Sequence, residues 1–326
     1  MKKTRIPLAF LVVFAVLVLL LTAQGREPRT VRVAMGYIPN VQFAPWYVAE
    51  AKGYFAREGL RVDFDYSLDV DGLALLAQGK KELAVGGGDM VIIGRSQGLP
   101  ITYVCSLYAK FPPSIVSLKE KKIASMADLK GKTVGIPYMG TSYIALRAML
   151  AKAGMKESDV RVVAIGYTQI ESLLKGKVDA AVVFANNEPV QLAALGHEFS
   201  QIYSYDYFPL VGHGVVTNER MLRDNPALVR AFVRATVDGM RYSLQNPKAA
   251  FDLVKAAINL PAGDEAVQYQ VFLASMALWE NAYTRRHGLG RSDPASWAQS
   301  QQFMLANGFI KRASAVEELM SNAYLP

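Results

Sequence analysis

The feature that most constrains the fold is an alternation of short β-rich runs with helical runs, which begins near residue 31. Runs rich in Val, Ile, Tyr and Phe favour strands, and the runs between them place apolar residues at helical spacing. The first series predicts strands at 31–37, 61–67, 83–85 and 101–107, and helices at 46–58, 73–78 and 90–97. This alternation predicts parallel βαβ units with buried strands.

The segment Phe111-Pro112-Pro113 interrupts this series, and a second series follows it. An extended run at 114–118 precedes strands expected at 133–136, 160–165 and 180–185, and helices expected at 142–153, 170–175 and 189–195. One more extended stretch contains Val215 and Val216. From Asn225 onward the sequence predicts only helices, at 226–246, 247–259, 264–283, 294–307 and 316–324. A tail without strands must pack on a sheet built elsewhere in the chain.

The sequence therefore predicts an α/β protein with two α/β lobes, a hinge and a helical C-terminal tail. A chain of 326 residues has room for two cores. We expect residues 30–115 and 213–326 to form the first lobe and residues 116–212 the second, with extended crossings near residues 114 and 212. Ligands of open α/β sheets bind at the carboxyl ends of the strands. In two facing lobes, those edges border a shared cleft.

The N-terminus has the organisation of an export signal. Lys2, Lys3 and Arg5 precede an unbroken apolar run at 8–21. We expect residues 1–25 to be an export signal, or alternatively an N-terminal membrane anchor, because the run is near the short limit for spanning a bilayer. Lipid attachment through a cysteine is not expected, since no Cys lies near this region.

The composition argues against nucleic-acid binding and metal chemistry. Four of the basic residues behind the net charge of +8 lie in the first 26 positions, and the other 32 face 28 acidic residues. No short block interleaves basic with aromatic residues, so no nucleic-acid partner is expected. Cys105 is the only cysteine, and His197, His213 and His287 lack a metal-binding spacing. We therefore expect no metal site and no cofactor.

Three loops at predicted strand-to-helix junctions carry the candidate ligand-binding residues. The first loop contains Tyr37, Asn40, Phe43 and Trp46. Aromatic faces stack on flat ligands, although aromatic residues at this point could equally seal the core of the lobe. We expect Asn40 to read the edge of a ligand, with Phe43 and Trp46 as candidate stacking faces.

The second loop contains Tyr138, Thr141, Ser142 and Tyr143. Hydroxyl groups and free backbone N–H groups at the start of a helix suit an acceptor atom or an anionic group of a ligand. They equally suit a simple helix cap, and the two roles are compatible. Tyr143 is a further candidate stacking face.

The third loop, Asn186-Asn187-Glu188, directly follows the strand expected at 180–185. Polar residues at this point either cap the next helix or contact a ligand. Two amides and a carboxylate exceed what one cap requires. We therefore expect Asn186, Asn187 and Glu188 to bind the ligand.

Three further residues complete the expected ligand-binding set. Gly88 and Asp89 follow a strand and open a helix, which is the context of an anion-binding turn. A tight turn with Asp89 as the helix N-cap explains the same residues. Asp71, just before the helix expected at 73–78, is the third.

The first loop and its surroundings resemble a known family. Gly36-Tyr37-Ile38-Pro39-Asn40, Tyr47-Val48-Ala49 and Gly53-Tyr54-Phe55 are similar to the opening of periplasmic solute-binding proteins of the aliphatic sulfonate/thiamine-pyrimidine family, and residues 127–136 resemble the entry to their second lobe. The resemblance implies the type II periplasmic-binding-protein fold, an ABC importer permease and its ATPase as partners, a periplasmic or extracytoplasmic location, and no catalysis in most members. We expect a monomer.

One branch of this family is an enzyme that makes the thiamine pyrimidine from its own histidine and pyridoxal phosphate, using iron. Its motif has a histidine at the position of Phe43, and it carries a cysteine-rich iron motif, whereas Cys105 is the sole cysteine here. These departures and the export signal predict a binding protein that is not an enzyme.

The resemblance leaves the ligand open between two vitamin-related classes. Gly98-Leu99-Pro100, Ser142-Tyr143-Ile144 and Asn186-Asn187-Glu188-Pro189 look most like receptors for riboflavin or a thiamine-pyrimidine precursor. An Asn amide matches the acceptor-donor-acceptor edge of a flavin, and a carboxylate such as Glu188 better matches an aminopyrimidine. The adjacent amides slightly favour the flavin. A receptor for sulfonate or nitrate anions is an alternative, although Glu188 would repel an anion. A secreted sensor without a transport role is another.

Overall fold

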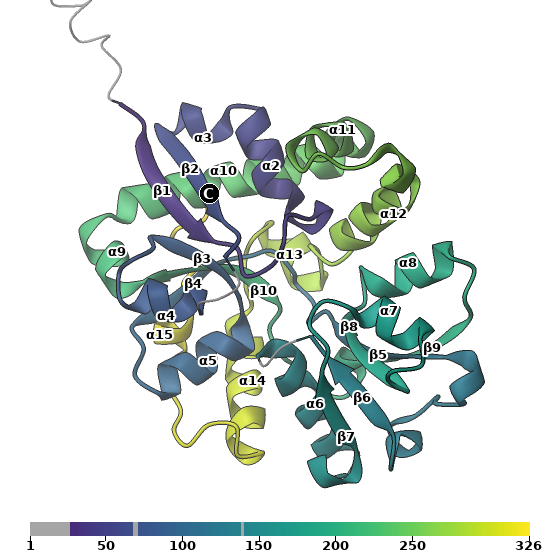
Figure 1. Cartoon of the computed structure of the whole chain (residues 1–326). Coiled ribbons are helices and arrows are strands. Elements are labelled where there is room, and N and C mark those ends of the chain that lie inside the picture. The colour runs from purple at the N-terminus through teal and green to yellow at the C-terminus, as the bar shows by residue number, and fades with distance from the viewer. Residues whose placement is uncertain (1–26, 68–70, 138–139) are drawn as a thin grey trace, which may run out of the picture.

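The computed structural model describes residues 27–67, 71–137 and 140–326. These residues form two five-stranded sheets, which lie in two lobes with helices packed on them (Figure 1). The expected export signal or anchor at residues 1–25 lies outside the described residues. Within the described ranges, no helix combines the length and the apolar character that crossing a bilayer requires.

The first sheet contains β1 (Arg29–Ala34), β2 (Leu60–Asp65), β3 (Leu83–Gly87), β4 (Ile101–Ser106) and β10 (His213–Asn218). The strand order is β2-β1-β3-β10-β4. β1 runs parallel to β2 and β3, as the alternation with helices predicts. β10 is antiparallel to both β3 and β4, a direction that the sequence, which predicts only an extended stretch around Val215 and Val216, leaves open. The chain re-enters this sheet from the other lobe and therefore runs in the opposite direction.

The second sheet contains β5 (Pro113–Leu118), β6 (Thr133–Ile136), β7 (Arg161–Ala164), β8 (Ala180–Phe184) and β9 (Phe199–Tyr203), in the order β7-β6-β8-β5-β9. β5 is antiparallel to β8 and β9. The expected lobe boundary between residues 115 and 116 falls inside β5, all of which belongs to this sheet. β9 is absent from the predicted strands, because this edge strand is mostly half-buried and its sequence alternates only weakly.

The chain crosses between the lobes twice, and the two crossing segments lie side by side. Residues 107–112 lead from β4 to β5, and residues 204–212 lead from β9 to β10. The backbone N–H groups of Leu107 and Tyr108 donate to the His213 carbonyl oxygen over 3.0 and 2.8 Å. Gly212 passes so close to the Tyr108 carbonyl that a side chain at position 212 would collide with it. The hinge therefore consists of two crossing segments that are hydrogen-bonded to each other.

Each lobe carries the helices that follow its strands. The first lobe has α2 (Ala44–Ala51), α3 (Tyr54–Arg57), α4 (Gly72–Ala77) and α5 (Gly88–Ser96), and the second has α6 (Thr141–Lys152), α7 (Gln169–Leu174) and α8 (Glu188–Ala194). The single helix expected at 46–58 is instead two helices. They are separated by Gly53, whose φ of +68° lies in the left-handed region that favours glycine.

The C-terminal residues are helical, as predicted. They form α9 (Glu219–Asp224), α10 (Pro226–Gln245), α11 (Pro247–Ala257), α12 (Glu265–Met276), α13 (Ala282–His287), α14 (Pro294–Ala306) and α15 (Val316–Leu319). The helix expected at 264–283 breaks after Met276, and the turn that follows buries Trp279 completely. The helix expected at 316–324 is only one turn long, because Met320 pairs with Tyr103 of β4.

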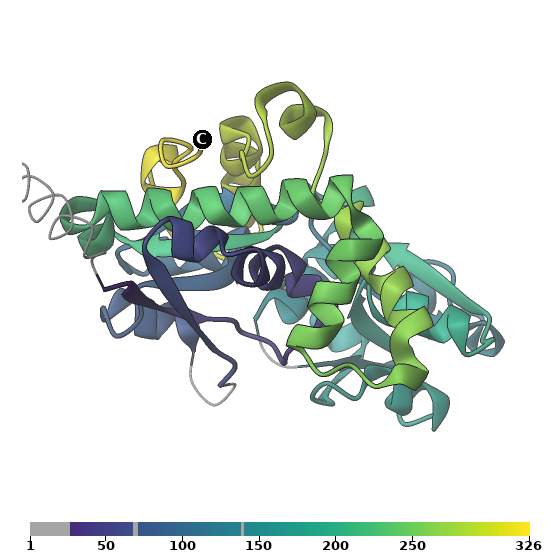
Figure 2. The same ribbon diagram turned by 90° about the horizontal axis from the view of Figure 1, so that it is seen from above.

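The tail connects the two lobes as well as covering the first. α10 lies along the first lobe against α2, and α11 and α12 continue from its end toward the second lobe (Figure 2). α12 packs on α8 of the second lobe and on the 3₁₀ helix η1 (Val41–Phe43) of the first. A segment that follows both lobes in sequence therefore contacts both of them near the hinge.

The contact between α10 and α2 provides a test of this packing. Gly239 of α10 lies against the Pro45 carbonyl oxygen, and a Cβ at position 239 would collide with that backbone atom. We expect Gly239→Ala to lower the free energy of unfolding by about 1–3 kcal/mol, although alanine is the better helix former. The control is Gly263→Ala, where no atom lies within 4 Å of the added Cβ. Urea unfolding of both variants measures the difference, and equal stabilities would contradict the packing.

Candidate ligand-binding site

A cavity of about 200 Å³ lies between the two lobes beside the hinge. It is lined by both lobes and by the crossing segments, and the lining is mainly apolar and aromatic with several polar side chains. The described lining residues are Met35, Gly36, Tyr37, Gln42, Phe43, Val85, Leu107, Tyr108, Pro137, Thr141, Ser142, Tyr167, Gln169, Val183, Phe184, Asn187, Glu188 and His213.

The first lobe contributes the loop after β1. Asn40 has an extended backbone (φ −152°, ψ 152°) and its Oδ1 accepts a hydrogen bond from the Gln42 backbone N–H over 3.0 Å. This cap starts η1, from which both Gln42 and Phe43 line the cavity. Asn40 itself is not among the described lining residues, contrary to the expectation that it reads the ligand, because its side-chain oxygen serves as the cap.

The second lobe contributes the starts of three helices. α6, α7 and α8 follow the carboxyl ends of β6, β7 and β8, so their first turns meet at one edge of the sheet. Thr141, Ser142, Gln169 and Glu188, which occupy these first turns, all line the cavity. Free backbone N–H groups of the first turns also point toward this edge. The second lobe therefore offers hydroxyl, amide and carboxyl groups to a ligand.

Glu188 is the acidic side chain among the described lining residues. It is 6% exposed, and its two oxygens accept hydrogen bonds from the Phe184 backbone N–H (3.0 Å) and from Asn187 Nδ2 (3.1 Å). Burial penalises the charged form and raises the pKa of Glu188 to about 7, while these hydrogen bonds partly oppose that rise. Glu188 can therefore accept or donate near neutral pH.

Asp89 joins the two lobes beneath the cavity. It lies in the first turn of α5, it is fully buried, and its Oδ1 accepts a hydrogen bond from Thr141 Oγ1 of α6 over 3.2 Å. Burial raises the pKa of Asp89 to about 7. Gly88 donates its backbone N–H to the Gly212 carbonyl of the hinge over 3.2 Å. Neither Gly88 nor Asp89 is among the described lining residues, and both instead link the first lobe to its neighbours.

Aromatic rings from both lobes and the hinge enclose the cavity. Tyr37 of the first lobe and Tyr167 of the second meet edge to face, with centroids 4.6 Å apart. The ring of His213 lies 5.2 Å from that of Phe184 and 6.5 Å from that of Tyr108. Burial lowers the pKa of His213 to about 4, so its imidazole is neutral at physiological pH. Several faces and edges of rings are therefore available to a flat ligand.

Six of the residues predicted from sequence line the cavity. They are Tyr37, Phe43, Thr141, Ser142, Asn187 and Glu188. All six lie within three residues of a helix start or a strand end, as expected for an α/β binding edge. Tyr138, which was also predicted, lies outside the described residues.

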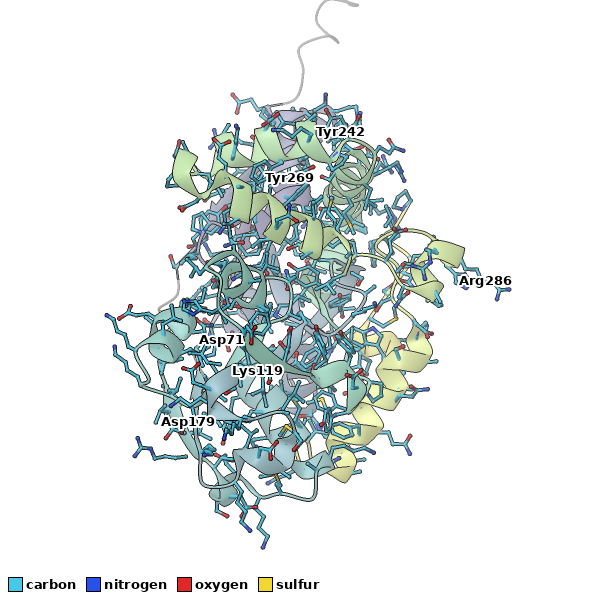
Figure 3. All side chains as sticks on the ribbon, turned by 90° about the vertical axis from the view of Figure 1, so that its right-hand side faces the viewer. Asp71, Lys119, Asp179, Tyr242, Tyr269 and Arg286 are labelled. Atoms are coloured by element: carbon cyan, nitrogen blue, oxygen red, sulfur yellow. The ribbon has the colours of Figure 1, made fainter. Side chains whose placement is uncertain are left out.

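Four other predicted residues have structural roles away from the described cavity lining. Trp46 is fully buried in the first lobe, where its Nε1 donates to Thr236 Oγ1 over 3.1 Å, so it is not the expected stacking face. Asp71, labelled in Figure 3, caps α4 by accepting from the Leu73 backbone N–H. Tyr143 points to the surface and donates to Glu157 over 2.7 Å. Asn186 lies behind the lining, where it contacts Gln42.

Sequence reasoning missed several lining residues. Gln42 lies in the first loop but is not among the predicted residues, and the sequence does not single out Tyr108, Tyr167, Gln169 or His213 as ligand contacts. A sequence signal exists for Gln169 and Tyr108, because each lies shortly after a strand. Groups of three or more His, Cys, Asp or Glu that could hold a metal ion are absent from the described ranges.

Residues 40–250 match the family described as NMT1/THI5 like, and the chain belongs to this family. It is 40% identical to the riboflavin-binding protein RibY of Chloroflexus aurantiacus over 91% of this chain and 86% of that protein. It is 28% identical to the formylaminopyrimidine-binding protein of Halalkalibacterium halodurans over 90% of each chain. Both relatives are binding proteins by name, and the expected family resemblance is confirmed.

Solved structures confirm the predicted fold. The alkanesulfonate-binding protein SsuA of Xanthomonas axonopodis pv. citri, bound to MOPS, aligns over 91% of this chain and 99% of its own, with a TM-score of 0.70 and 15% sequence identity. At this identity the likeness concerns the architecture alone. The chain therefore has the periplasmic-binding-protein fold with a helical C-terminal region.

The burial of Glu188 predicts a pH dependence of stability. Its pKa rises from about 4.5 in the unfolded chain to about 7 in the folded one, so its protonated form stabilises the fold fully below pH 4.5. That contribution is lost as the pH rises through 7. We expect wild-type stability, measured relative to Glu188→Gln, to fall by roughly 3 kcal/mol between pH 4.5 and 8. Urea unfolding across this range measures it. The exposed Glu120→Gln serves as control, and a flat difference for Glu188→Gln would contradict the burial.

Proposed function

We propose that this chain is the extracytoplasmic solute-binding component of an ABC importer, and that it binds a neutral planar heterocycle of the riboflavin type in the cavity between its lobes. The observation that carries the proposal is a cavity lined by aromatic rings and neutral polar groups. The 40% identity with a riboflavin-binding protein supports the same ligand class.

The charges around the cavity disfavour the alternative of a sulfonate or nitrate receptor. None of the described lining residues is Lys or Arg, and the ionised form of Glu188 would repel an anion. Two arginines that could serve as cations are engaged elsewhere. Arg95 forms an ion pair with Glu219 at 2.6 Å, and Arg147 approaches Glu157 at 3.5 Å. An anion would therefore depend on helix N-termini alone.

A thiamine-pyrimidine precursor is the second candidate ligand, and Glu188 is the observation that favours it. A carboxyl group pairs well with the ring nitrogen and amino group of an aminopyrimidine. A relative that is 28% identical is named as a formylaminopyrimidine-binding protein. We place the flavin first because the identity with its receptor is higher and because rings from three parts of the chain surround the cavity.

This chain lacks the residues that the synthase alternative would require. Phe43, and not a histidine, occupies the relevant position in η1 and lines the cavity. Cys105 is 1% exposed in β4, and burial raises the pKa of its thiol to about 12. A buried thiol of this kind is protonated and packs as a small apolar group. The proposal is therefore binding without catalysis.

Closure of the lobes around the ligand is the proposed mechanism. The Asp89–Thr141 hydrogen bond and the Tyr37–Tyr167 contact already connect the lobes across the cavity. A ligand that touches both lobes adds contacts that exist only in the closed state and so shifts the population toward it. An importer permease with its ATPase is the proposed partner that recognises this state, and residues 1–25 would direct export.

Titration with riboflavin tests the proposal. We expect riboflavin fluorescence to be quenched on binding and the unfolding temperature to rise, with smaller or no effects from taurine and nitrate. Phe43→Leu, which removes a ring face from the cavity, should weaken binding about 5–10-fold.

Trp46→Phe is the matched control for this titration. It removes the hydrogen bond that the indole N–H donates to Thr236 in the core. We expect it to lower the free energy of unfolding by about 1 kcal/mol and to leave riboflavin affinity unchanged. A thermal shift with an aminopyrimidine but none with riboflavin would favour the second candidate. A shift with sulfonates alone would refute both vitamin-related ligands.

A further inference from the structure

A chain of hydrogen bonds runs from α12 to the cavity through side chains far apart in the sequence. Ser275 Oγ donates to the Val271 carbonyl oxygen over 2.7 Å. Asn186 Nδ2 donates to Ser275 Oγ over 2.8 Å and to Gln42 Oε1 over 2.8 Å. Ser275 and Asn186 are 0% and 2% exposed, so both side chains are shielded from bulk solvent.

Each link of this chain fixes the direction of the next. The single hydroxyl proton of Ser275 is committed to Val271, so Ser275 can only accept from Asn186. Asn186 must therefore turn its NH₂ group toward Ser275. The same NH₂ group donates to Gln42, so Gln42 must turn its carbonyl oxygen toward Asn186. Tyr108 also donates its hydroxyl proton to Gln42 Oε1, over 3.3 Å.

The reverse orientation of Asn186 is much less favourable. Its Oδ1 is buried and has no hydrogen-bond partner among the described residues, which is a penalty in itself. If the amide were turned around, with Gln42 and Ser275 left as they are, that oxygen would face Ser275 Oγ and Gln42 Oε1 at the present 2.8 Å distances and could accept only the Tyr108 hydroxyl proton, across 3.3 Å. Two oxygen–oxygen contacts without a proton are worse than one unpaired acceptor. The orientation therefore follows from the contacts.

The consequence appears at Gln42, whose amide both lines the cavity and belongs to this chain. Its oxygen accepts hydrogen bonds from Asn186 and Tyr108, while its Nε2 has no hydrogen bond to the described residues. This nitrogen is also not fully buried, since it is absent from the buried polar atoms that lack a partner. We propose that Asn186 is a positioning residue that holds Gln42 Nε2 toward the cavity as a donor, so that the site selects a ligand with a carbonyl oxygen or ring nitrogen at this edge. This inference rests on the proposed function.

The inference also gives α12 a part in ligand selection. Val271 and Ser275 lie on the C-terminal tail, Asn186 on the second lobe and Gln42 on the first. Gln42 can present its donor only when all three parts are in contact. Recognition of the acceptor is thereby coupled to the closed arrangement of the lobes.

Hydrogen exchange of side-chain amides tests the orientation without any ligand. In protein labelled with ¹⁵N-glutamine, the Gln42 Nε2 signals are identified by their loss in Gln42→Met. We expect these protons to exchange rapidly in the wild type, because they face the cavity. In Asn186→Asp, the new oxygen attracts the Gln42 NH₂ group, and exchange should slow at least tenfold. Slow exchange in the wild type that is unchanged in Asn186→Asp would overturn the inference.

Riboflavin binding tests the consequence for selectivity. In Asn186→Asp, Gln42 turns its oxygen toward the ligand acceptor, and affinity should fall at least tenfold. Gln42→Met should lower riboflavin affinity about 3–10-fold. The double variant that also carries Asn186→Asp should bind only slightly more weakly than Gln42→Met alone, because Asn186 acts through Gln42. Ser275→Ala frees the Asn186 amide to rotate and should give an intermediate loss.

Asn218→Asp is the control for a buried Asn-to-Asp change. Asn218 is 2% exposed and its Nδ2 donates to the Leu76 carbonyl over 2.8 Å, away from the cavity. It should lower stability without changing riboflavin affinity. Additive losses for Asn186→Asp and Gln42→Met would overturn the positioning role. If the wild type does not bind riboflavin at all, the proposed function fails, and the exchange measurement still decides the orientation of Gln42.

Discussion

The paired crossing segments are the constraint on which the cavity depends. Leu107 and Tyr108 bond to His213, and Gly212 packs directly on the Tyr108 backbone, so the two crossings form one narrow connection. This connection places the carboxyl ends of β6, β7 and β8 opposite the loop that follows β1. Neither lobe alone encloses a ligand. The binding edge of each sheet becomes a wall of the same cavity only because the hinge aligns them.

The fold could be predicted largely because its signals are local and repeated. Strand runs followed by helical runs, with Gly53, Gly59 or Gly154 near the helix ends, indicate the two α/β lobes without any tertiary knowledge. The errors arose where tertiary contacts decide. Trp279 ends a predicted helix because its ring is buried in the core, and the antiparallel direction of β5 and β10, which the sequence leaves open, arises because each enters its sheet after a crossing between the lobes.

The site could be predicted by position but not by side-chain direction. Strand-end loops were the right places, and Glu188 and Phe43 do line the cavity. Trp46 lies three residues after Phe43, yet it points into the core because α2 packs under α10 and buries that face. Gln42 could not be recognised because distant residues turn its side chain toward the cavity. Its orientation depends on Asn186 and Ser275, which lie more than 140 and 230 residues away, and no local pattern contains that information.

The electrostatics of the cavity follow from burial more than from formal charge. Glu188 and Asp89 both have pKa values raised to about 7, and His213 has its pKa lowered to about 4, all chiefly by desolvation. Burial thus moves each of these groups toward its neutral form near physiological pH. A neutral cavity gains little from attracting charge. Its selectivity must therefore come from matching donors and acceptors, since a ligand that leaves the Gln42 donor or the Glu188 carboxyl unpaired is penalised by the same desolvation that sets their state.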